Sequence, residues 1–275
     1  MRIFFADPAN VGENSITIDN TDDLHHMLKV LRLSEGDKIE ISDGMEWEYE
    51  AEILYLSRER AEARILDKQR FTSESHVKIT LFQGIPKQSK MDTIVQKAVE
   101  FGVFRISPVF TARTVVTDNG NFSKKVQRWR RISAEAVKQC KRGIIPEVTE
   151  PCGFTELLGA LEEFDLVLIP YENEDGVTLK DELRKFRQKQ GEASRSSARG
   201  SSPEYNHLSE SGGLSDNGGD CRIALIIGPE GGFSDEEVRL VTAAGGKSVS
   251  LGKRILRTET AGIAAVAMIM YELEL

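Results

Sequence analysis

Two loops, each preceded by a strand pattern, hold the residues best suited to chemistry. The first is Gly228 to Gly232, GPEGG, which follows the apolar run Ile223 to Ile227. Three glycines and a proline in five residues are incompatible with a regular strand or helix, and glycine lets a ligand approach the backbone closely. The alternative is a tight structural turn, which glycine clusters usually form. Glu230 in this loop is either a hydrogen-bond acceptor or a solvated carboxylate.

The second loop separates the strand pattern Ser248 to Leu251 from a long apolar helix pattern that Thr258 could cap. Arg257 in this loop has apolar neighbours, so we expect its guanidinium to be partly buried and to need an anionic partner. That partner is a phosphate group or a carboxylate such as Glu230 or Glu259. Glu259 is also explained by the favourable position of an acid near a helix N-terminus.

A basic segment, Ser123 to Gly143, carries eight lysines or arginines and one glutamate, a local charge of +7 in a chain of net charge −8. Its periodicity predicts an amphipathic helix. It is either a solvated surface helix or a surface that follows RNA phosphates. In the N-terminal region His26 is a further candidate, although a lone histidine is more often structural than functional. The candidate RNA contacts are His26, Arg32, Lys87, Lys90, Arg113, Lys124, Lys125, Arg128, Arg131, Lys138 and Arg142.

The elements that position these residues fall into two regions, which we expect to be domains 1–71 and 72–275. The first region has short strand patterns around turns and one helical segment, which is typical of a small β-barrel. The expected strands are Ile3 to Phe5, Ser15 to Ile18, Lys38 to Ser42, Trp47 to Ser57 and Ala61 to Leu66, with a helix from Asp22 to Leu33.

In the second region apolar strands alternate with amphipathic helices, which predicts an α/β fold with a mostly parallel sheet covered on both faces. Ser234 and Glu237 have capping-box spacing, so a helix should follow the GPEGG loop. Both loops would then lie at the carboxyl ends of strands, where open α/β sheets bind ligands. Residues 189–220 are rich in Ser, Gly and Asn and predict a flexible insertion. The expected strands are Val77 to Gln83, Phe104 to Phe110, Leu166 to Ile169, Ile223 to Ile227 and Ser248 to Leu251.

Composition narrows the possible classes of protein. The three cysteines, Cys140, Cys152 and Cys221, are isolated, so we expect reduced thiols in a cytoplasmic protein and neither disulfides nor a metal site. The apolar run Ala261 to Tyr271 is about half a membrane span, so it predicts a core helix.

Five segments resemble the RsmE family, the ribosomal RNA small-subunit methyltransferases E of the SPOUT class. The segment near the N-terminus resembles the family's PUA-like RNA-binding domain, and the insertion at 189–220 departs from the family pattern. The segments are HMLKVLRLSEGD (His26 to Asp37), KQSKMDTIVQKAVEFGV (Lys87 to Val103), RWRRISAEAVKQCKR (Arg128 to Arg142), IGPEGGFSDEE (Ile227 to Glu237) and LGKRILRTETA (Leu251 to Ala261).

The resemblance implies a PUA-like β-barrel followed by a SPOUT-type α/β domain with a C-terminal trefoil knot, a feature that few folds have. It also implies a homodimer that methylates N3 of one uridine in the small-subunit (16S) ribosomal RNA, in assembled 30S particles. S-adenosyl-L-methionine would bind the knot loops. The implied cofactor-binding residues are Ile169, Pro170, Tyr171, Glu172, Ile227, Gly228, Pro229, Glu230, Gly231, Gly232, Leu251, Gly252, Ile255 and Leu256.

The chemistry of uracil agrees with this family. The weakly acidic N3 proton must leave before or during methyl transfer, and a nearby cation such as Arg257 would stabilise the developing anion. Glu230, Glu259 and water are the candidate proton acceptors. Two alternatives stay open: an RNA-binding module with a vestigial cofactor fold, and a methyltransferase that acts on another RNA or another base atom.

Overall fold

The computed structural model describes residues 3–71, 74–116, 122–198 and 220–274. These residues form two compact units. The first comprises residues up to Glu74 together with Arg130–Pro146, and the second comprises Ser75–Trp129 together with the chain from Glu147 onward. Helix α3 (Phe122–Cys140) therefore contributes residues to both units. The predicted domain boundary between residues 71 and 72 stays a prediction.

The first unit is built on a five-stranded sheet of described residues with the order β1-β3-β4-β5-β2. All the neighbouring strands are antiparallel except the parallel pair β1 and β3. Apolar side chains that alternate along the strands form its core, including the fully buried Ile16, Ile41 and Ile53. The strands are β1 (Ile3–Phe5), β2 (Ser15–Ile18), β3 (Lys38–Ser42), β4 (Trp47–Leu56) and β5 (Ala61–Arg70).

The helix predicted from Asp22 to Leu33 is present but irregular. Asn20 caps α1 (Thr21–His25) by accepting hydrogen bonds from two backbone N–H groups. The chain then continues as a π-helix (His26–Leu31). This helix ends at Arg32, which has the left-handed conformation with φ of 54°. A short 3-10 helix (Pro8–Asn10) precedes β2.

The second unit is an α/β fold whose described strands form one sheet with the order β12-β10-β11-β6-β7-β8, and β9 also pairs with β7. Every strand pair in it is parallel, as the alternating pattern predicts. The strands are β6 (Val77–Gly84), β7 (Arg105–Phe110), β8 (Glu147–Val148), β9 (Cys152–Gly153), β10 (Leu166–Pro170), β11 (Cys221–Ile227) and β12 (Lys247–Val249).

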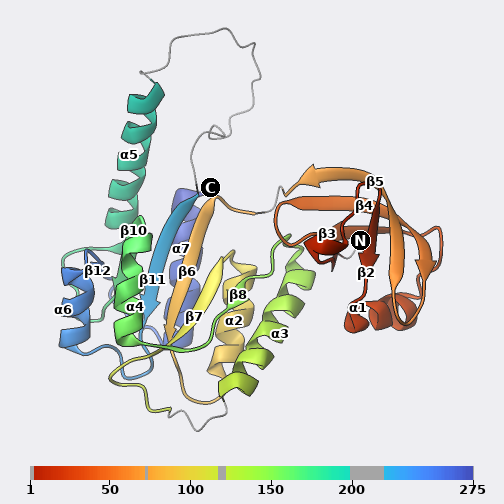
Figure 1. Cartoon of the computed structure of the whole chain (residues 1–275). Coiled ribbons are helices and arrows are strands. Elements are labelled where there is room, and N and C mark those ends of the chain that lie inside the picture. The colour runs from red at the N-terminus through yellow and green to blue at the C-terminus, as the bar shows by residue number, and fades with distance from the viewer. Residues whose placement is uncertain (1–2, 72–73, 117–121, 199–219, 275) are drawn as a thin grey trace. The chain divides into compact units, whose positions relative to one another are not determined.

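Helices cover both faces of this sheet (Figure 1). On one face α7 packs on β6 and β11 and contacts α2 and α5. On the other face α4 and α6 pack over the core that includes Phe82, Ile169 and Ile226. The apolar run predicted as a core helix lies in α7 and buries Val266 and Ile269. The helices are α2 (Lys90–Glu100), α4 (Phe154–Ala160), α5 (Leu179–Ala198), α6 (Asp235–Ala243) and α7 (Thr258–Leu273), with a 3-10 helix at Leu161–Glu163.

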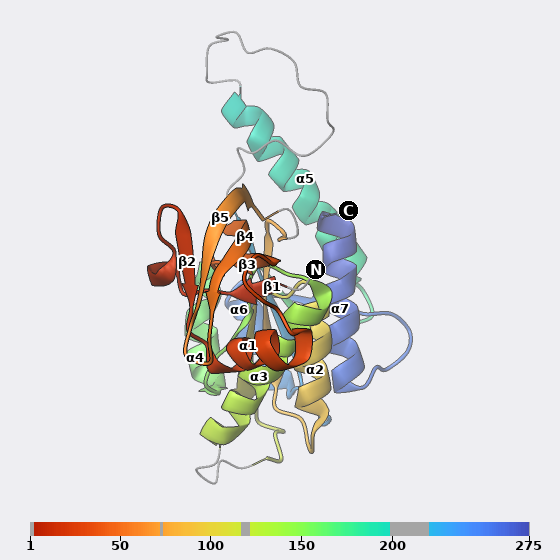
Figure 2. The ribbon, with the colours of Figure 1, turned by 90° about the vertical axis from the view of Figure 1, so that its right-hand side faces the viewer.

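The predicted insertion at 189–220 begins differently from the expectation. Residues 189–198 continue α5, which projects beyond the sheet (Figures 1 and 2). The helix persists because several Lys, Arg, Glu and Gln residues here have good helix propensity although few are apolar. Residues 199–219 lie outside the described part of the chain. Among the described helices none is long and apolar enough to cross a membrane.

Candidate functional site

Three loops meet at one edge of the parallel sheet. Strand β10 lies between β12 and β11, and the three strands run in the same direction. Their carboxyl ends, at Pro170, Ile227 and Val249, therefore lie together. The Tyr171 N–H donates to the Val249 carbonyl at 3.0 Å, which ties the loop after β10 to the end of β12. The loops that the resemblance assigns to the cofactor are thus neighbours in space.

The GPEGG loop is a tight turn, closed by a hydrogen bond of 2.9 Å from the Gly232 N–H to the Pro229 carbonyl. Gly232 has φ of +67°, and a Cβ there would lie 2.6 Å from Glu172 Oε1. The positive φ of the turn favours glycine at this position, and a larger residue would also displace the carboxylate of Glu172. The structural-turn interpretation is therefore sufficient for Gly232, and the evidence for a ligand site must come from the groups around the loop.

Thr258 links this loop to α7. Its hydroxyl donates to the Gly228 carbonyl at 2.6 Å and accepts a hydrogen bond from Gln83 Nε2 at 2.9 Å. The prediction that Thr258 caps α7 is wrong, because α7 begins at Thr258 and its N-cap position is Arg257, which makes no side-chain capping bond. The Thr258 hydroxyl donates to the Gly228 carbonyl and does not cap its own helix. Gln83 was not predicted, since nothing in a buried strand pattern indicates a contact 175 residues away.

Glu230 is held by one group from the loop before α2 and one from the first residue of that helix. Its carboxylate accepts the Lys87 N–H at 3.1 Å and lies 2.9 Å from the Lys90 ammonium. Partial burial raises the pKa of Glu230, but the hydrogen bonds from Lys90 and Lys87 outweigh it, so the net pKa lies below the ordinary value of 4.5. Glu230 is therefore ionised and a weak base.

Lys90 also approaches the other predicted acid, with 3.4 Å between its ammonium and Glu259 Oε2. Glu259 lies in the first turn of α7, as predicted. Arg257 next to it is exposed, so the expectation of a partly buried guanidinium is wrong. The neighbours from which burial was inferred do not enclose Arg257, because Ile255 is itself 86% exposed. The structure thus brings Glu230 and Glu259 together through Lys90.

The capping box at the start of α6 is confirmed. Ser234 Oγ accepts the Glu237 N–H, and Glu237 Oε2 accepts the Ser234 N–H. Glu237 is buried, and its second oxygen accepts the Ala112 N–H at 2.8 Å from the loop after β7. The adjacent Arg113, predicted to contact RNA, donates to the Gly231 carbonyl at 2.9 Å. The β7 loop therefore also packs against the GPEGG loop.

Within the second unit, Lys124, Lys125 and Arg128 are exposed on the first turns of α3. The Lys125 ammonium lies 4.4 Å from the centroid of the Phe122 ring, and Arg128 pairs with Asp92 at 2.5 Å. Lys87 is also exposed. These positions allow RNA contact, and such contact stays a prediction.

Within the first unit, Arg131 is exposed, whereas Arg142 is 7% exposed and forms hydrogen bonds with Glu74 through two nitrogens. The proposed RNA contact at Arg142 is therefore corrected: its charge is neutralised inside the protein. Lys138 forms an ion pair with the buried Asp23. The two remaining candidates, His26 and Arg32, lie at opposite ends of the π-helix.

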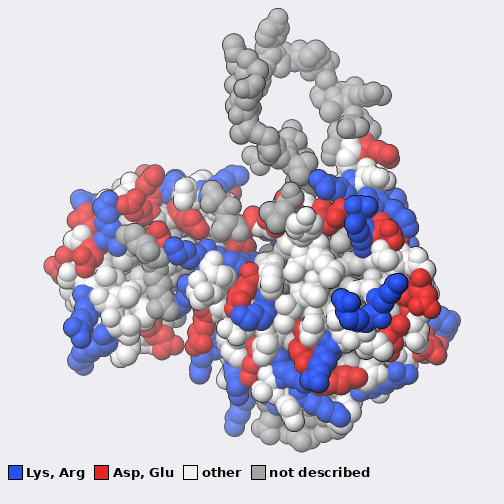
Figure 3. Space-filling model, turned by 180° about the vertical axis from the view of Figure 1, so that it is seen from behind, with Lys and Arg blue, Asp and Glu red and all other residues white. Residues whose placement is uncertain are grey.

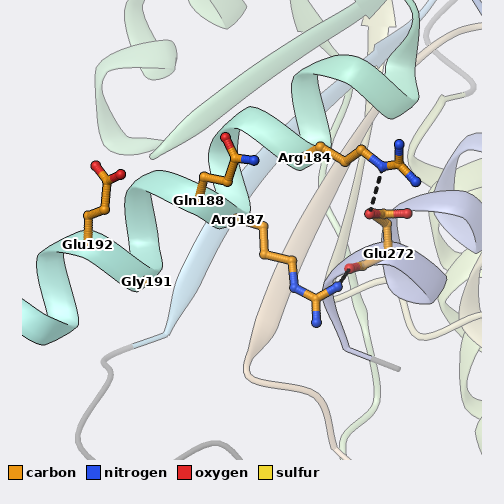
Figure 4. Close-up of a pocket in the computed structure, with 6 residues that line it drawn as sticks. All are labelled: Arg184, Arg187, Gln188, Gly191, Glu192 and Glu272. Carbon is orange, nitrogen blue, oxygen red and sulfur yellow. Dashed lines mark hydrogen bonds and ion pairs between the residues drawn. The ribbon is translucent and has the colours of Figure 1, made fainter.

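A hollow of about 580 Å³ lies elsewhere in the second unit, between α5 and the C-terminal end of α7 (Figure 4). Both of its arginines already have partners, because Arg184 pairs with Glu272 at 3.6 Å and Arg187 donates to the Glu272 carbonyl at 3.2 Å. The length of α7, about 24 Å for 16 residues at 1.5 Å per residue, separates it from the loops that precede that helix. This hollow is not the predicted site.

Comparison with known proteins identifies the family. The model of the RNA methyltransferase domain matches residues 73–197 and 202–270, and that of the RNA methyltransferase PUA domain matches residues 18–66. The ribosomal RNA small subunit methyltransferase E of Bacillus subtilis is 32% identical, over 92% of this chain and 89% of its own length. The chain belongs to the RsmE family. The predicted order of a PUA-like domain and an α/β methyltransferase domain is confirmed.

Two solved structures resemble this RsmE-family chain along nearly its whole length. One is a ribosomal RNA small subunit methyltransferase E from Neisseria gonorrhoeae bound to S-adenosyl methionine, with 30% identity, a TM-score of 0.75, and coverage of 98% of this chain and 97% of that one. The other is a putative methyltransferase from Legionella pneumophila in complex with the same cofactor, with 29% identity, a TM-score of 0.73, and coverage of 98% and 96%.

The three loops of this RsmE-family chain fit such a cofactor. A Cβ on Gly252 would meet nothing within 4 Å, so the backbone there borders open space. Beside it, Leu251 and Leu256 are half-buried and Ile255 is largely exposed, which provides apolar surface for a flat base. Glu172, against Gly232, supplies a carboxylate that can accept hydrogen bonds. Within the described residues no group of three or more His, Cys, Asp or Glu side chains could hold a metal ion.

Proposed function

We propose that this protein transfers a methyl group from S-adenosyl-L-methionine to N3 of a uridine in the 16S RNA of the small ribosomal subunit. The observation that carries the proposal is the match to ribosomal RNA small subunit methyltransferases E over nearly the whole chain, in both domains. The three neighbouring loops support it, since they offer apolar surface, backbone and carboxylates at one sheet edge. The proposed location is the cytoplasm, where assembled 30S particles are found.

The residues proposed to hold the cofactor lie on the three loops. Leu251, Gly252, Ile255 and Leu256 would cover the adenine, and the turn at Gly228 to Gly232 would contribute backbone groups. Ile169, Pro170, Tyr171 and Glu172 would complete the site from the third loop. Bound there, the cofactor supplies an electrophilic methyl group, while the protein supplies orientation.

The proton on uracil N3 decides what the protein's own residues must do. Arg257 is exposed directly before α7, so its guanidinium can approach the base and stabilise negative charge as N3 loses its proton. Glu230 is a poor acceptor, because Lys90 and Lys87 already use its lone pairs and lower its pKa. We therefore propose that Glu259 or water takes the proton.

The deciding experiment is methyl transfer from labelled S-adenosyl-L-methionine to small subunits from a strain that lacks this modification, followed by nucleoside analysis. We expect the label in 3-methyluridine. Label in another nucleoside would refute the N3 assignment and keep the methyltransferase. Absence of both label and cofactor binding would refute the enzyme and favour an RNA-binding module.

We also propose that the chain acts as a homodimer through the outward face of α7. This face carries Ala261, Ala264, Met268 and Tyr271 at helical spacing, and Tyr271 is 70% exposed. Viewed from behind, the second unit shows a broad uncharged area bordered by charged side chains (Figure 3). Large exposed apolar patches mark protein interfaces, and Met268 and Tyr271 contribute exposed apolar surface to this face. In sedimentation equilibrium, wild type should be dimeric and Tyr271→Glu monomeric, whereas the control Arg239→Gln on α6 should stay dimeric.

A further inference from the structure

Lys90 occupies a position that its predicted role as an RNA contact does not explain. It is the first residue of α2, and its ammonium lies 2.9 Å from Glu230 Oε1 and 3.4 Å from Glu259 Oε2. Glu230 belongs to the loop between β11 and α6, and Glu259 belongs to the first turn of α7. One ammonium group therefore bridges three elements that are far apart in the sequence.

The bridge is partly shielded from water. The side chain of Lys90 is 27% exposed, that of Glu230 is 27% exposed and that of Glu259 is 22% exposed. Glu259 Oε2 itself is buried and makes no hydrogen bond in the described part of the chain. Without Lys90, two carboxylates within about 6 Å of each other would lack their shared counter-charge, a situation that raises the free energy of the ionised pair.

We propose that Lys90 is a positioning residue that holds the GPEGG loop against the start of α7 by neutralising Glu230 and Glu259 together. Its ammonium thus forms ion pairs within the methyltransferase domain and does not bind RNA phosphates. The expected effect of Lys90 on cofactor binding rests on the proposed function. Its role in holding the loop through Glu230 and Glu259 does not. Thr258 reinforces the same junction, since it joins α7 to the Gly228 carbonyl.

The other charged groups nearby are engaged elsewhere or are exposed. On α2, Asp92 pairs with Arg128, and Lys97 pairs with Glu100 at 2.8 Å. Arg257, next to Glu259, is exposed. Lys97 therefore provides a matched control: it is on the same helix and forms an ion pair, but its partner is on α2 itself.

The first test uses the cofactor-free protein, so that it does not depend on the proposed function. In Lys90→Met the two carboxylates repel each other at neutral pH, and protonation of one of them relieves the repulsion. We expect the thermal midpoint of Lys90→Met to fall below that of wild type at about pH 8 and to approach it toward about pH 5. Lys90→Arg should restore most of the loss, as should Glu230→Gln combined with Lys90→Met. Lys97→Met should show no such pH dependence.

The second test measures S-adenosyl-L-methionine binding by calorimetry and RNA binding at several salt concentrations. We expect Lys90→Met to weaken cofactor binding by about 10- to 100-fold, the range for removing a hydrogen bond to a charged group, and to leave the salt slope of RNA binding unchanged. The proposal would be overturned if the difference in thermal midpoint between Lys90→Met and wild type did not change with pH. It would also be overturned if Lys90→Met kept its cofactor affinity and the salt slope of its RNA binding were smaller by about 0.9. Failure of wild type to bind the cofactor would refute the proposed function, while the test on cofactor-free protein would still decide the role of Lys90.

Discussion

Replacing Arg142 should destabilise the first unit and should not act mainly on RNA binding. Its side chain is 8% exposed and that of its partner Glu74 is 7% exposed, and their closest nitrogen–oxygen distance is 2.7 Å. Glu74 also accepts the backbone N–H groups of Gly143 at 3.0 Å and Ile144 at 3.1 Å. Arg142→Met would remove a buried cation and leave a buried carboxylate with two neutral donors. Breaking a buried pair in this way typically costs about 3–5 kcal/mol of unfolding free energy.

The two tryptophans allow this loss to be assigned to the first unit. Trp47 lies in β4 of that unit and Trp129 lies in the second. A Trp129→Phe background therefore leaves Trp47 fluorescence as the reporter of the first unit in urea-induced unfolding. In this background Arg142→Met should lower the unfolding free energy by about 3–5 kcal/mol. The exposed Arg131→Met should change it by less than about 0.5 kcal/mol.

A double variant separates the buried charge from the lost hydrogen bonds. In Glu74→Gln/Arg142→Met no charge is buried, and the amide oxygen of Gln can still accept from Gly143 and Ile144. We expect it to be more stable than Arg142→Met alone. If Arg142→Met unfolded within about 1 kcal/mol of the reference and bound RNA more weakly, the internal role of Arg142 would be refuted.

Four further outcomes follow from the site. Thr258→Val removes both hydrogen bonds of its hydroxyl, so calorimetry should show cofactor affinity reduced by about tenfold or more, while Thr258→Ser should bind normally. Arg257→Ala should lower turnover more than cofactor affinity, and a loss of affinity alone would make Arg257 a binding residue. Gly232→Val, which places a branched side chain at positive φ and against Glu172, should lower the thermal midpoint and cofactor affinity. Because the pKa of Glu230 is lowered, its ion pair stabilises the fold above about pH 4.5 and is lost as pH falls below that value; the acid unfolding curve of Glu230→Gln should lack this contribution.

Local patterns were enough to predict most of the fold. The alternation of strand and helix patterns predicted the parallel sheet, and every strand pair in the second unit is parallel. The Ser234–Glu237 spacing predicted the start of α6, because a capping box is a contact between residues three positions apart. Composition was less reliable at 189–198, where helix propensity overrides the polar, Ser-rich character on which the prediction of a loop rested.

The candidate site was predicted in its loops but not in its contacts. The two glycine-containing loops were expected at the carboxyl ends of strands, and they follow β11 and β12; the third loop, which only the resemblance implied, follows β10 between them. The hydroxyl of Thr258 was assigned to its own helix because capping is the only local role that its position indicates. Its actual partners are 30 and 175 residues away in the sequence. A contact at that separation leaves no periodic signal, so only the fold reveals it.

The same distance limit explains why the predicted RNA contacts have different roles in the structure. A sequence pattern records where cations cluster, but the partners of Lys90, Lys138 and Arg142 are 140, 115 and 68 residues away. A cation that is already paired with a carboxylate neutralises few RNA phosphates and so displaces few counterions from the RNA. It therefore adds little to the salt slope of binding. Exposed cations such as Lys124 and Arg131 retain that capacity. The charge of +7 counted along the basic segment therefore overstates the number of phosphates that it can neutralise.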